Sequence, residues 1–239
     1  MTINNAAAQA PKRSLEQLIN TTEPAWPLVQ EWIKNASNQV EVLNATPSQA
    51  NETLLHAQVT TRSPMGAIIL NSGGILVDHG WIRILGSGNA KMKRTLHTWN
   101  ANKTFDNTGQ NTGYILVADD AIGGYYAING GGLGKDAGKA YYLDPATLQW
   151  EALDLTYSQL IVSFFCGDLQ AFYKDLRWKN WEKEIATMTG DEVINCYPML
   201  YTKEGSDINK VHRKSVPVEE QWTFTYDIIQ QLISAKPAK

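Results

Sequence analysis

Residues 113–129 read GYILVADDAIGGYYAIN, and this stretch decides the fold. Residues 113–118 form an apolar run with the length and composition of a β-strand, and residues 125–129 repeat that character after a break. The residues between them, 119–124, are turn formers, because aspartate accepts backbone N–H bonds and glycine takes positive φ. Two strands joined by a tight turn pair antiparallel. The centre of the chain is therefore predicted to be an antiparallel sheet.

Strand patterns continue on both sides of this hairpin. Asp78-His79-Gly80 is a predicted hairpin turn upstream, and residues 130–138 are a glycine-rich loop downstream. A further turn signal, Asn71-Ser72-Gly73-Gly74, follows a compact apolar run. The additional predicted strands are residues 67–70, 75–77, 81–85, 139–143 and 150–153.

Two segments show no regular pattern. Residues 86–112 are rich in Gly, Asn, Thr and Lys, which predicts an irregular, exposed excursion anchored by Leu96 and Trp99. Residues 187–214 are predicted to be less regular than their neighbours.

Helical patterns occupy the two ends of the chain. The N-caps predicted near the start are Ser14, with Gln17 completing a capping box, Thr22 and Thr46. After the strands, apolar residues keep helical phase over 157–176, with a break at Gly167-Asp168. A final helix is predicted to start at 215–217.

Helices, then strands, then helices predict an α+β fold, with an antiparallel or mixed twisted sheet and helices packed on one side. The length of 239 residues suits one large domain, which we place at 14–235. Residues 1–13 are predicted to be a disordered leader; they contain no apolar core of a signal peptide. The sequence contains no run of eighteen apolar residues, so no membrane span is predicted.

Charge and cysteine content limit the functional classes. The net charge is −3, and the longest basic cluster is Lys91-Met92-Lys93-Arg94, which argues against nucleic-acid binding. Of the two cysteines, Cys166 falls on an apolar helical pattern and is predicted to be a buried free thiol. A free thiol favours the reducing cytoplasm.

Catalytic and cofactor motifs are not found in the sequence. Residues 130–136, GGGLGKD, differ from a phosphate-binding loop at two essential positions. The four histidines follow no metal-ligand spacing, so no metal, cofactor or catalytic residue is predicted. The adjacent pair Asp119-Asp120 has two interpretations, turn chemistry or a site for a cation or acid–base catalysis.

Residues 113–176 resemble the Smi1/Knr4 (SUKH) superfamily. The resemblance rests on 114–120, on the glycine and aromatic segment 123–128, on Tyr141-Tyr142-Leu143-Asp144 and on the Phe-rich segment 158–165. The chain from about Ser14 also resembles a bacterial family of uncharacterised proteins. The resemblance implies an α+β fold, and many bacterial members of the superfamily are immunity proteins that neutralise toxins.

Two functions follow as hypotheses. The first is a non-enzymatic protein-binding module with a protein partner, of which toxin neutralisation by an immunity-like protein is one form. Its candidate binding residues, expected to be exposed, are Trp81, Trp99, Asp119, Asp120, Tyr125 and Tyr126. The alternative for each aromatic residue is packing within the sheet.

The second hypothesis is a small-molecule or carbohydrate-binding protein with a pocket under loops 86–112 and 130–138. An enzyme would instead require Asp119 or Asp120 to meet His79 or His97 in a cleft. A homodimer formed through a sheet edge or the last helix is a further alternative.

Overall fold

The computed structural model describes residues 12–104 and 112–235. Its main sheet has seven strands in chain order, and each strand is antiparallel to the next. The strands are β1 (Val40–Asn44), β2 (Ser72–Val77), β3 (Ile82–Leu85), β4 (Tyr114–Asp120), β5 (Tyr125–Asn129), β6 (Lys139–Asp144) and β7 (Gln149–Thr156). A second sheet pairs β8 (Glu192–Tyr197) with β9 (His212–Pro217).

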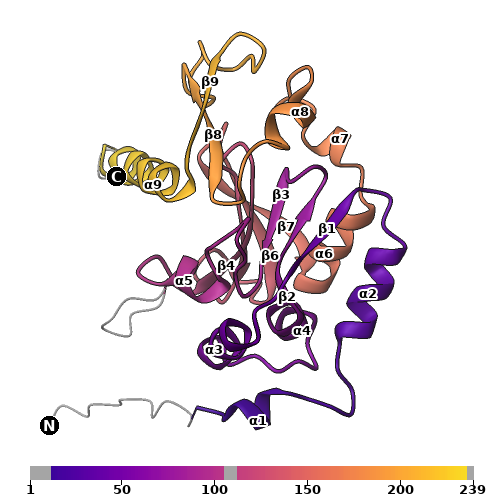
Figure 1. Ribbon diagram of the computed structural model, residues 1–239. Coiled ribbons are helices and arrows are strands. Elements are labelled where there is room, and N and C mark those ends of the chain that lie inside the picture. Colours follow the sequence, from indigo (N-terminus) through magenta and orange to yellow (C-terminus); the bar gives the residue numbers. More distant parts are fainter. Residues whose placement is uncertain (1–11, 105–111, 236–239) are drawn as a thin grey trace, which may run out of the picture.

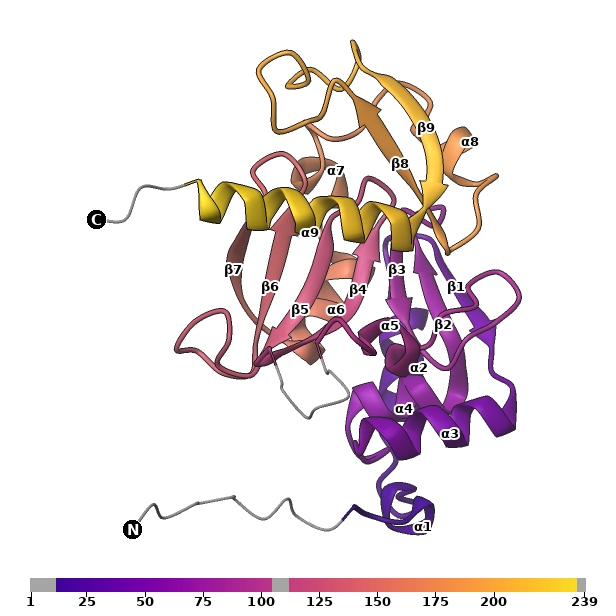
Figure 2. The same cartoon turned by 90° about the vertical axis from the view of Figure 1, so that its left-hand side faces the viewer.

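Helices lie on both faces and at one end of the main sheet (Figures 1 and 2). In Figure 2, α9 crosses the near face and α6 lies behind the strands. The helices are α1 (Leu15–Leu18), α2 (Trp26–Lys34), α3 (Pro47–Ala57), α4 (Pro64–Asn71), α5 (Leu96–Asn100), α6 (Tyr157–Cys166), α7 (Leu169–Phe172), α8 (Trp181–Ile185) and α9 (Val218–Ser234). None of the helices in the described ranges is long and apolar enough to cross a membrane.

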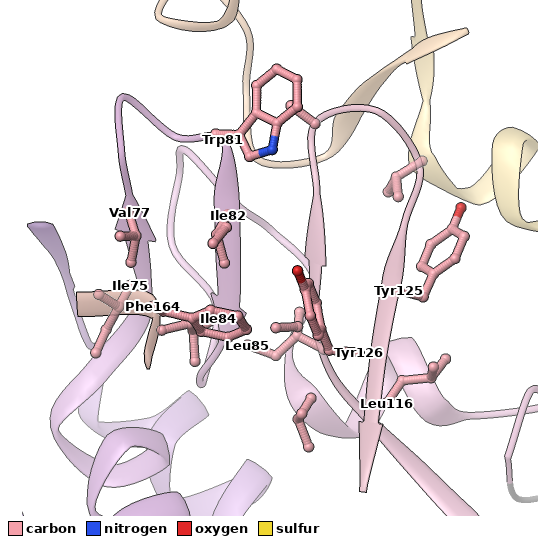
Figure 3. Close-up of a cluster of buried hydrophobic side chains, with 14 of the residues drawn as sticks. Ile75, Val77, Trp81, Ile82, Ile84, Leu85, Leu116, Tyr125, Tyr126 and Phe164 are labelled. Carbon is pink, nitrogen blue, oxygen red and sulfur yellow. The ribbon is translucent and has the colours of Figure 1, made fainter. Parts of the chain in front are cut away.

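Neighbouring tyrosines on β5 show how both faces are covered. Successive strand residues point to opposite faces, and Figure 3 shows the Tyr125 and Tyr126 rings on either side of the strand. Tyr126 packs edge-on against Phe164 of α6, with ring centroids 4.8 Å apart. Tyr125 packs edge-on against Trp222 of α9 at 4.7 Å. The predicted α+β class and antiparallel sheet are confirmed, and α9 with the second sheet adds cover on the other face.

Most predicted elements are present, and α4 is the main error. Residues 67–70 belong to this helix and not to a strand, and residues 72–74 continue into β2 instead of turning. The Ser63 hydroxyl accepts a hydrogen bond from the Gly66 N–H, and Pro64 occupies the first turn. A capped helix buried on several sides shows the same short apolar run as a strand, which explains the error.

The start of α2 also differs from the prediction. Thr22 is not its N-cap, because the helix begins at Trp26 after Ala25. Asn20 Oδ1 instead accepts bonds from the N–H groups of Thr22 and Glu23, which makes a turn of that segment. The capping box of Ser14 and Gln17 and the break before α7, where Asp168 caps the helix, are confirmed.

The segment predicted as an exposed excursion is largely buried where it is described. Leu96 and Trp99 do anchor it, and they lie on α5. Ser87, Asn100 and Thr104 are also buried, so the expectation of an exposed loop is wrong for this part. Residues 105–111 lie outside the described residues. The region 187–214, predicted as less regular, contributes β8 and the start of β9.

The predicted leader, 1–13, lies outside the described residues up to residue 11. Arg13 is described, and its backbone N–H donates to Gln58 Oε1 at 2.7 Å. The described residues thus include Lys12 and Arg13, which the prediction assigned to the leader.

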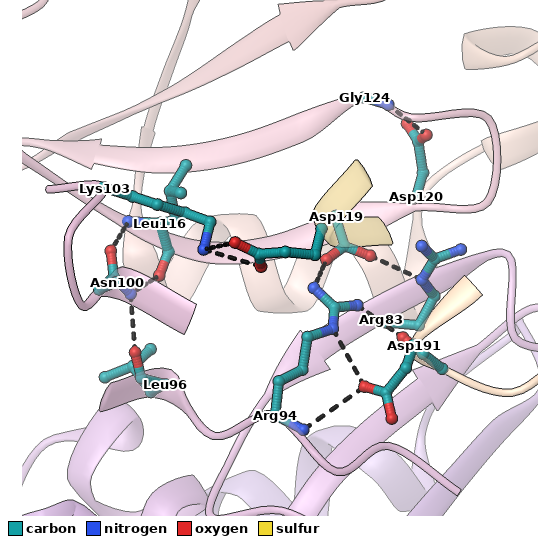
Figure 4. Close-up of polar contacts among 12 residues, drawn as sticks. Arg83, Arg94, Leu96, Asn100, Lys103, Leu116, Asp119, Asp120, Gly124 and Asp191 are labelled. Carbon is teal, nitrogen blue, oxygen red and sulfur yellow. Dashed lines mark hydrogen bonds and ion pairs between the residues drawn. The ribbon is translucent and has the colours of Figure 1, made fainter. Parts of the chain in front are cut away.

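Asn100 extends the main sheet where β3 ends. The β3–β4 pairing reaches only Ile84 and Ala118. Beyond it, Asn100 Oδ1 accepts from the Leu116 N–H and its Nδ2 donates to the Leu116 carbonyl, both at 2.8 Å (Figure 4). The side-chain amide thus occupies the place of a strand neighbour and attaches α5 to β4.

Replacement of this amide tests that role. Asn100→Ala leaves the buried N–H and carbonyl of Leu116 without partners, so the free energy of unfolding should fall by about 2–4 kcal/mol. Urea denaturation followed by tryptophan fluorescence measures the change. Asn209→Ala, at an exposed position, should change it by less than about 0.5 kcal/mol. Equal effects of the two substitutions would contradict the assigned role.

Candidate functional site

Asp119 lies at the centre of a buried ionic network. It stands opposite Arg83 across β3 and β4, and Arg83 Nε lies 2.6 Å from Asp119 Oδ1. Arg94, from the segment before α5, pairs with the other oxygen, Oδ2. Arg83 is 1% exposed and Asp119 is 0% exposed, so this pairing is shielded from water. Both carboxylate oxygens of Asp119 are thus held by guanidinium groups (Figure 4).

Arg94 extends the network to the beginning of β8. Its Nη2 donates to the Gly190 carbonyl at 2.6 Å, and its Nε lies 3.4 Å from Asp191 Oδ1. Burial by itself lowers the pKa of Arg94, but attraction to Asp119, the hydrogen bond to that carboxylate and attraction to Asp191 raise it above its ordinary value. Arg94 therefore stays charged, and two cations face two carboxylates.

The predicted aromatic binding residues are not exposed. Trp81, Trp99, Tyr125 and Tyr126 are 0%, 2%, 0% and 1% exposed, so the expectation that they present an open binding surface is wrong. The physical reason is the cover on both faces of the sheet. Packing within the sheet and against its helices accounts for all four.

The four aromatic residues pack in two aromatic clusters. Tyr125 contacts Trp99 and Trp222, and the Arg94 guanidinium lies 4.6 Å from the Trp99 ring centroid. Trp81 packs against Trp181 at 4.9 Å in the second cluster. Other members of the second cluster are Tyr173, Trp178 and Arg177.

Asp119 and Asp120 do not act as a pair, because they point to opposite faces of β4. Asp120 Oδ1 accepts from the N–H groups of Ile122 and Gly124, and Oδ2 accepts from the Tyr142 hydroxyl at 2.7 Å. Burial raises the pKa of Asp120 even though the bonds from Tyr142 and Gly124 lower it. Asp120 therefore holds the β4–β5 turn together, as the turn interpretation predicts. Within the described ranges, no cluster of three or more metal-ligating side chains is present.

A pocket lies over the first three strands, and we call it the β1–β3 pocket. Its volume is about 220 Å³. Leu76 and Arg83, which face each other across β2 and β3, lie on its sheet side. Its lining also includes Glu41, His79, Lys91, Ile185, Met188 and Thr189.

The charged groups of this pocket differ in how far they are already paired. Lys91 Nζ contacts Glu41 Oε1 at 2.5 Å, and both side chains are about half exposed or more. Arg83 is buried, and its Nη2 has no hydrogen-bond partner among the described residues. The pocket thus combines a solvated ion pair with a buried guanidinium that has an unpartnered N–H donor group.

Sequence reasoning missed Arg83, although a signal for it exists. Arg83 stands alone in the apolar strand sequence Trp81-Ile82-Arg83-Ile84-Leu85. A charge in the middle of a buried strand needs a charged partner. Asp119, directly after the predicted strand 113–118, was available as that partner, but the pairing of β3 with β4 was not predicted.

Two pockets use residues of the first of the two loops under which a pocket was predicted. The β1–β3 pocket and a hollow beside Trp99 and Val218 both use residues of the segment 86–104. None of their lining residues comes from 130–138, which connects β5 to β6.

Two of the histidines, distant in sequence, meet at the contact of α3 with α5. The rings of His56 and His97 are stacked with centroids 3.9 Å apart. Burial, and then repulsion from His56, lower the pKa of His97, against an opposing attraction to Glu52.

The two cysteines differ in exposure. Cys166 is exposed, so the prediction of a buried thiol is wrong, because this residue lies on the outward side of the last turn of α6. Cys196 is the buried one, and burial raises the pKa of its thiol to about 12. An exposed Cys166 therefore does not support the expected reducing compartment.

The fold and the site define an α+β protein with an arginine–aspartate network beneath a small surface pocket. Residues 15–221 match the family model described as "Protein of unknown function DUF2625", and the chain belongs to this family. An uncharacterized protein of Haemophilus influenzae is 41% identical over 90% of this chain and 94% of its own length. The putative uncharacterized protein YbfG of Escherichia coli is 37% identical over 90% of this chain and 97% of its own length. No solved structure matches the chain.

Loss of the central carboxylate should destabilise the protein strongly. Asp119→Asn leaves Arg83 and Arg94 buried without their shared anion, so the free energy of unfolding should fall by about 3–5 kcal/mol. The matched control is Asp154→Asn, an exposed position at positive φ that asparagine tolerates. Urea denaturation of both variants compares them, and a loss below 1 kcal/mol, roughly the value of a surface pair, would refute the network's role.

The stacked histidines give a second prediction. His56→Ala removes the repulsion that lowers the pKa of His97, so the His97 pKa should rise toward its ordinary value. NMR titration of the His97 ring measures it, with His79→Ala as a control at a distant histidine. An unchanged His97 pKa in His56→Ala would show that burial alone causes the shift.

Proposed function

We propose that this chain is a non-enzymatic small-molecule-binding protein whose ligand occupies the β1–β3 pocket. The observation that carries the proposal is the buried Arg83, which lines the pocket and whose Nη2 has no hydrogen-bond partner among the described residues. Buried charged donors are normally hydrogen-bonded, and exceptions occur preferentially at functional sites. A polar ligand group would complete the hydrogen bonding of Arg83.

The size and lining of the pocket support a small ligand. Its volume of about 220 Å³ lies below the range of about 300–1,000 Å³ typical of drug-sized ligands. Apolar side chains from two elements line it, Leu76 from the sheet and Ile185 and Met188 from the region of α8. A few polar groups among apolar walls are typical of binding sites for small molecules.

We propose a non-catalytic role because the Asp119 carboxylate is already paired with arginines. Asp119 is separated from the pocket by Arg83, and both of its oxygens are held by arginines. It therefore does not meet His79 as a free base, which is the arrangement that an enzyme would need.

A pocket-filling substitution tests the proposal. Leu76→Trp places a large ring in the β1–β3 pocket, so a ligand found by thermal-shift screening of a small-metabolite panel should bind the variant at least about tenfold more weakly. Leu55→Trp, at an exposed leucine of α3, should bind the ligand like the wild type. A ligand that binds Leu76→Trp unchanged would place the site elsewhere.

Protein binding is the second candidate, and a stripe on α9 favours it. Trp222 and Thr225 anchor the first half of this helix. Tyr226 in its middle is 43% exposed, and Leu232 and Ile233 near its end are 52% and 57% exposed. Exposed apolar residues gathered on one element are typical of interaction sites. Under this proposal, the resemblance to the SUKH superfamily would extend to an immunity-like role with a toxin as partner.

The stripe can be tested by a charge substitution. Ile233→Asp should abolish stoichiometric capture of a protein partner, because a desolvated carboxylate opposes burial at an interface. Gln230→Asp adds the same charge at a neighbouring exposed position and should leave capture intact. Capture that survives Ile233→Asp, measured with tagged protein and mass spectrometry, would remove the stripe from consideration.

A further inference from the structure

We infer that the β1–β3 pocket recognises the carboxylate of a small organic acid, an inference that rests on the proposed ligand-binding function. The carboxylate would accept hydrogen bonds from Arg83, and the rest of the molecule would lie against the apolar walls. Hydrogen-bond capacity, charge balance and the wall residues each support one part of this assignment.

The hydrogen-bond capacity of Arg83 points to an oxygen acceptor. A guanidinium carries five N–H donors in a planar fork and has no acceptor. Arg83 uses Nε on Asp119, and the remaining oxygen of Asp119 is occupied by Arg94. Figure 4 shows the Nη nitrogens of Arg83 turned away from Asp119. Because Nη2 is buried and unpartnered, an acceptor from outside the protein would remove an unfavourable state.

The charge balance weighs against a ligand with more than one negative charge. The network contributes two arginines, Arg83 and Arg94, against Asp119 and Asp191. At the rim, Lys91 is already paired with Glu41. A ligand with one negative charge can accept from the unpartnered donors of Arg83. A phosphate group carries a charge of about −1.5 to −2 at neutral pH. It would face the Glu41 carboxylate without a further cation to balance it. A carboxylate also matches the flat fork of a guanidinium.

The walls define the remainder of the ligand. Leu76 lies beside Arg83 on the sheet, and Ile185 and Met188 are contributed by α8 and the residues after it. Burial of a branched hydrocarbon chain against these side chains is favourable by the hydrophobic effect. A short branched acid therefore fits the charge, the lining and the volume of about 220 Å³ together.

The test compares a carboxylate with its neutral isostere on the unmodified protein. Isovalerate and isovaleramide share a hydrocarbon body, and only the acid carries the charge that Arg83 would bind. Charge-assisted hydrogen bonds are stronger than neutral ones, so isovalerate should bind about ten- to hundredfold more tightly, measured by ligand-observed NMR titration. Inorganic phosphate, the third probe, should bind more weakly than isovalerate.

A variant assigns the preference to Arg83. Arg83→Lys keeps a positive charge beside Asp119 but loses the fork, so the preference for acid over amide should fall by about tenfold. Circular dichroism and a thermal melt check that this variant is folded. The comparison of isovalerate with isovaleramide on the wild-type protein does not depend on the variant. Leu76→Trp should lose both isovalerate and isovaleramide.

The outcomes separate this inference from the proposed function. Equal binding of acid and amide, both lost in Leu76→Trp, would overturn carboxylate recognition and sustain a small-molecule pocket. Tighter binding of phosphate than isovalerate would overturn the carboxylate in favour of a phosphate ligand. No detectable binding of isovalerate at millimolar concentration would also overturn the inference. The proposed function itself fails only if no panel ligand is sensitive to Leu76→Trp.

Discussion

A carboxylate buried in a sheet requires cations, and the structure of this protein depends on how Asp119 obtains two of them. Removing a charge from water costs several kcal/mol even after relaxation, roughly the whole stability of a small domain. Arg83 must therefore stand opposite Asp119, which sets the register of β3 against β4. Arg94 must reach the same carboxylate, which draws the segment before α5 onto the sheet and, through Gly190 and Asp191, fixes where β8 begins.

The same network explains why the sheet is covered on both faces. The ion pairs would be weaker if only loops open to water covered them, because solvent weakens ionic attraction. Trp99, Tyr125 and Trp222 form an aromatic layer around the network, and α9 carries the last of these across the face. The tryptophans therefore exclude solvent from the ions, a role that composition alone does not distinguish from recognition.

Much of the fold could be predicted from local patterns, and the site could not. The β4–β5 hairpin, the capping box at Ser14 and the interruption at Gly167 are encoded within a few residues and were predicted correctly. The β1–β3 pocket combines Glu41, Arg83 and Met188, which are far apart in sequence and meet only through tertiary pairing. Burial of Trp81 or Tyr125 likewise depends on elements that arrive from elsewhere in the chain, so strand pattern could not determine their exposure.

The seven strands of the main sheet pair in the order in which they occur along the chain. Each ladder therefore forms between successive strands, and the entropy lost in closing the intervening loop grows only slowly with its length. The two long closures are between β1 and β2, with α3 and α4 inserted, and between β3 and β4. These two closures therefore lose the most loop entropy among the ladders of the main sheet. The second of them also brings Arg83 to Asp119, so the ionic network can form only once that long loop has closed.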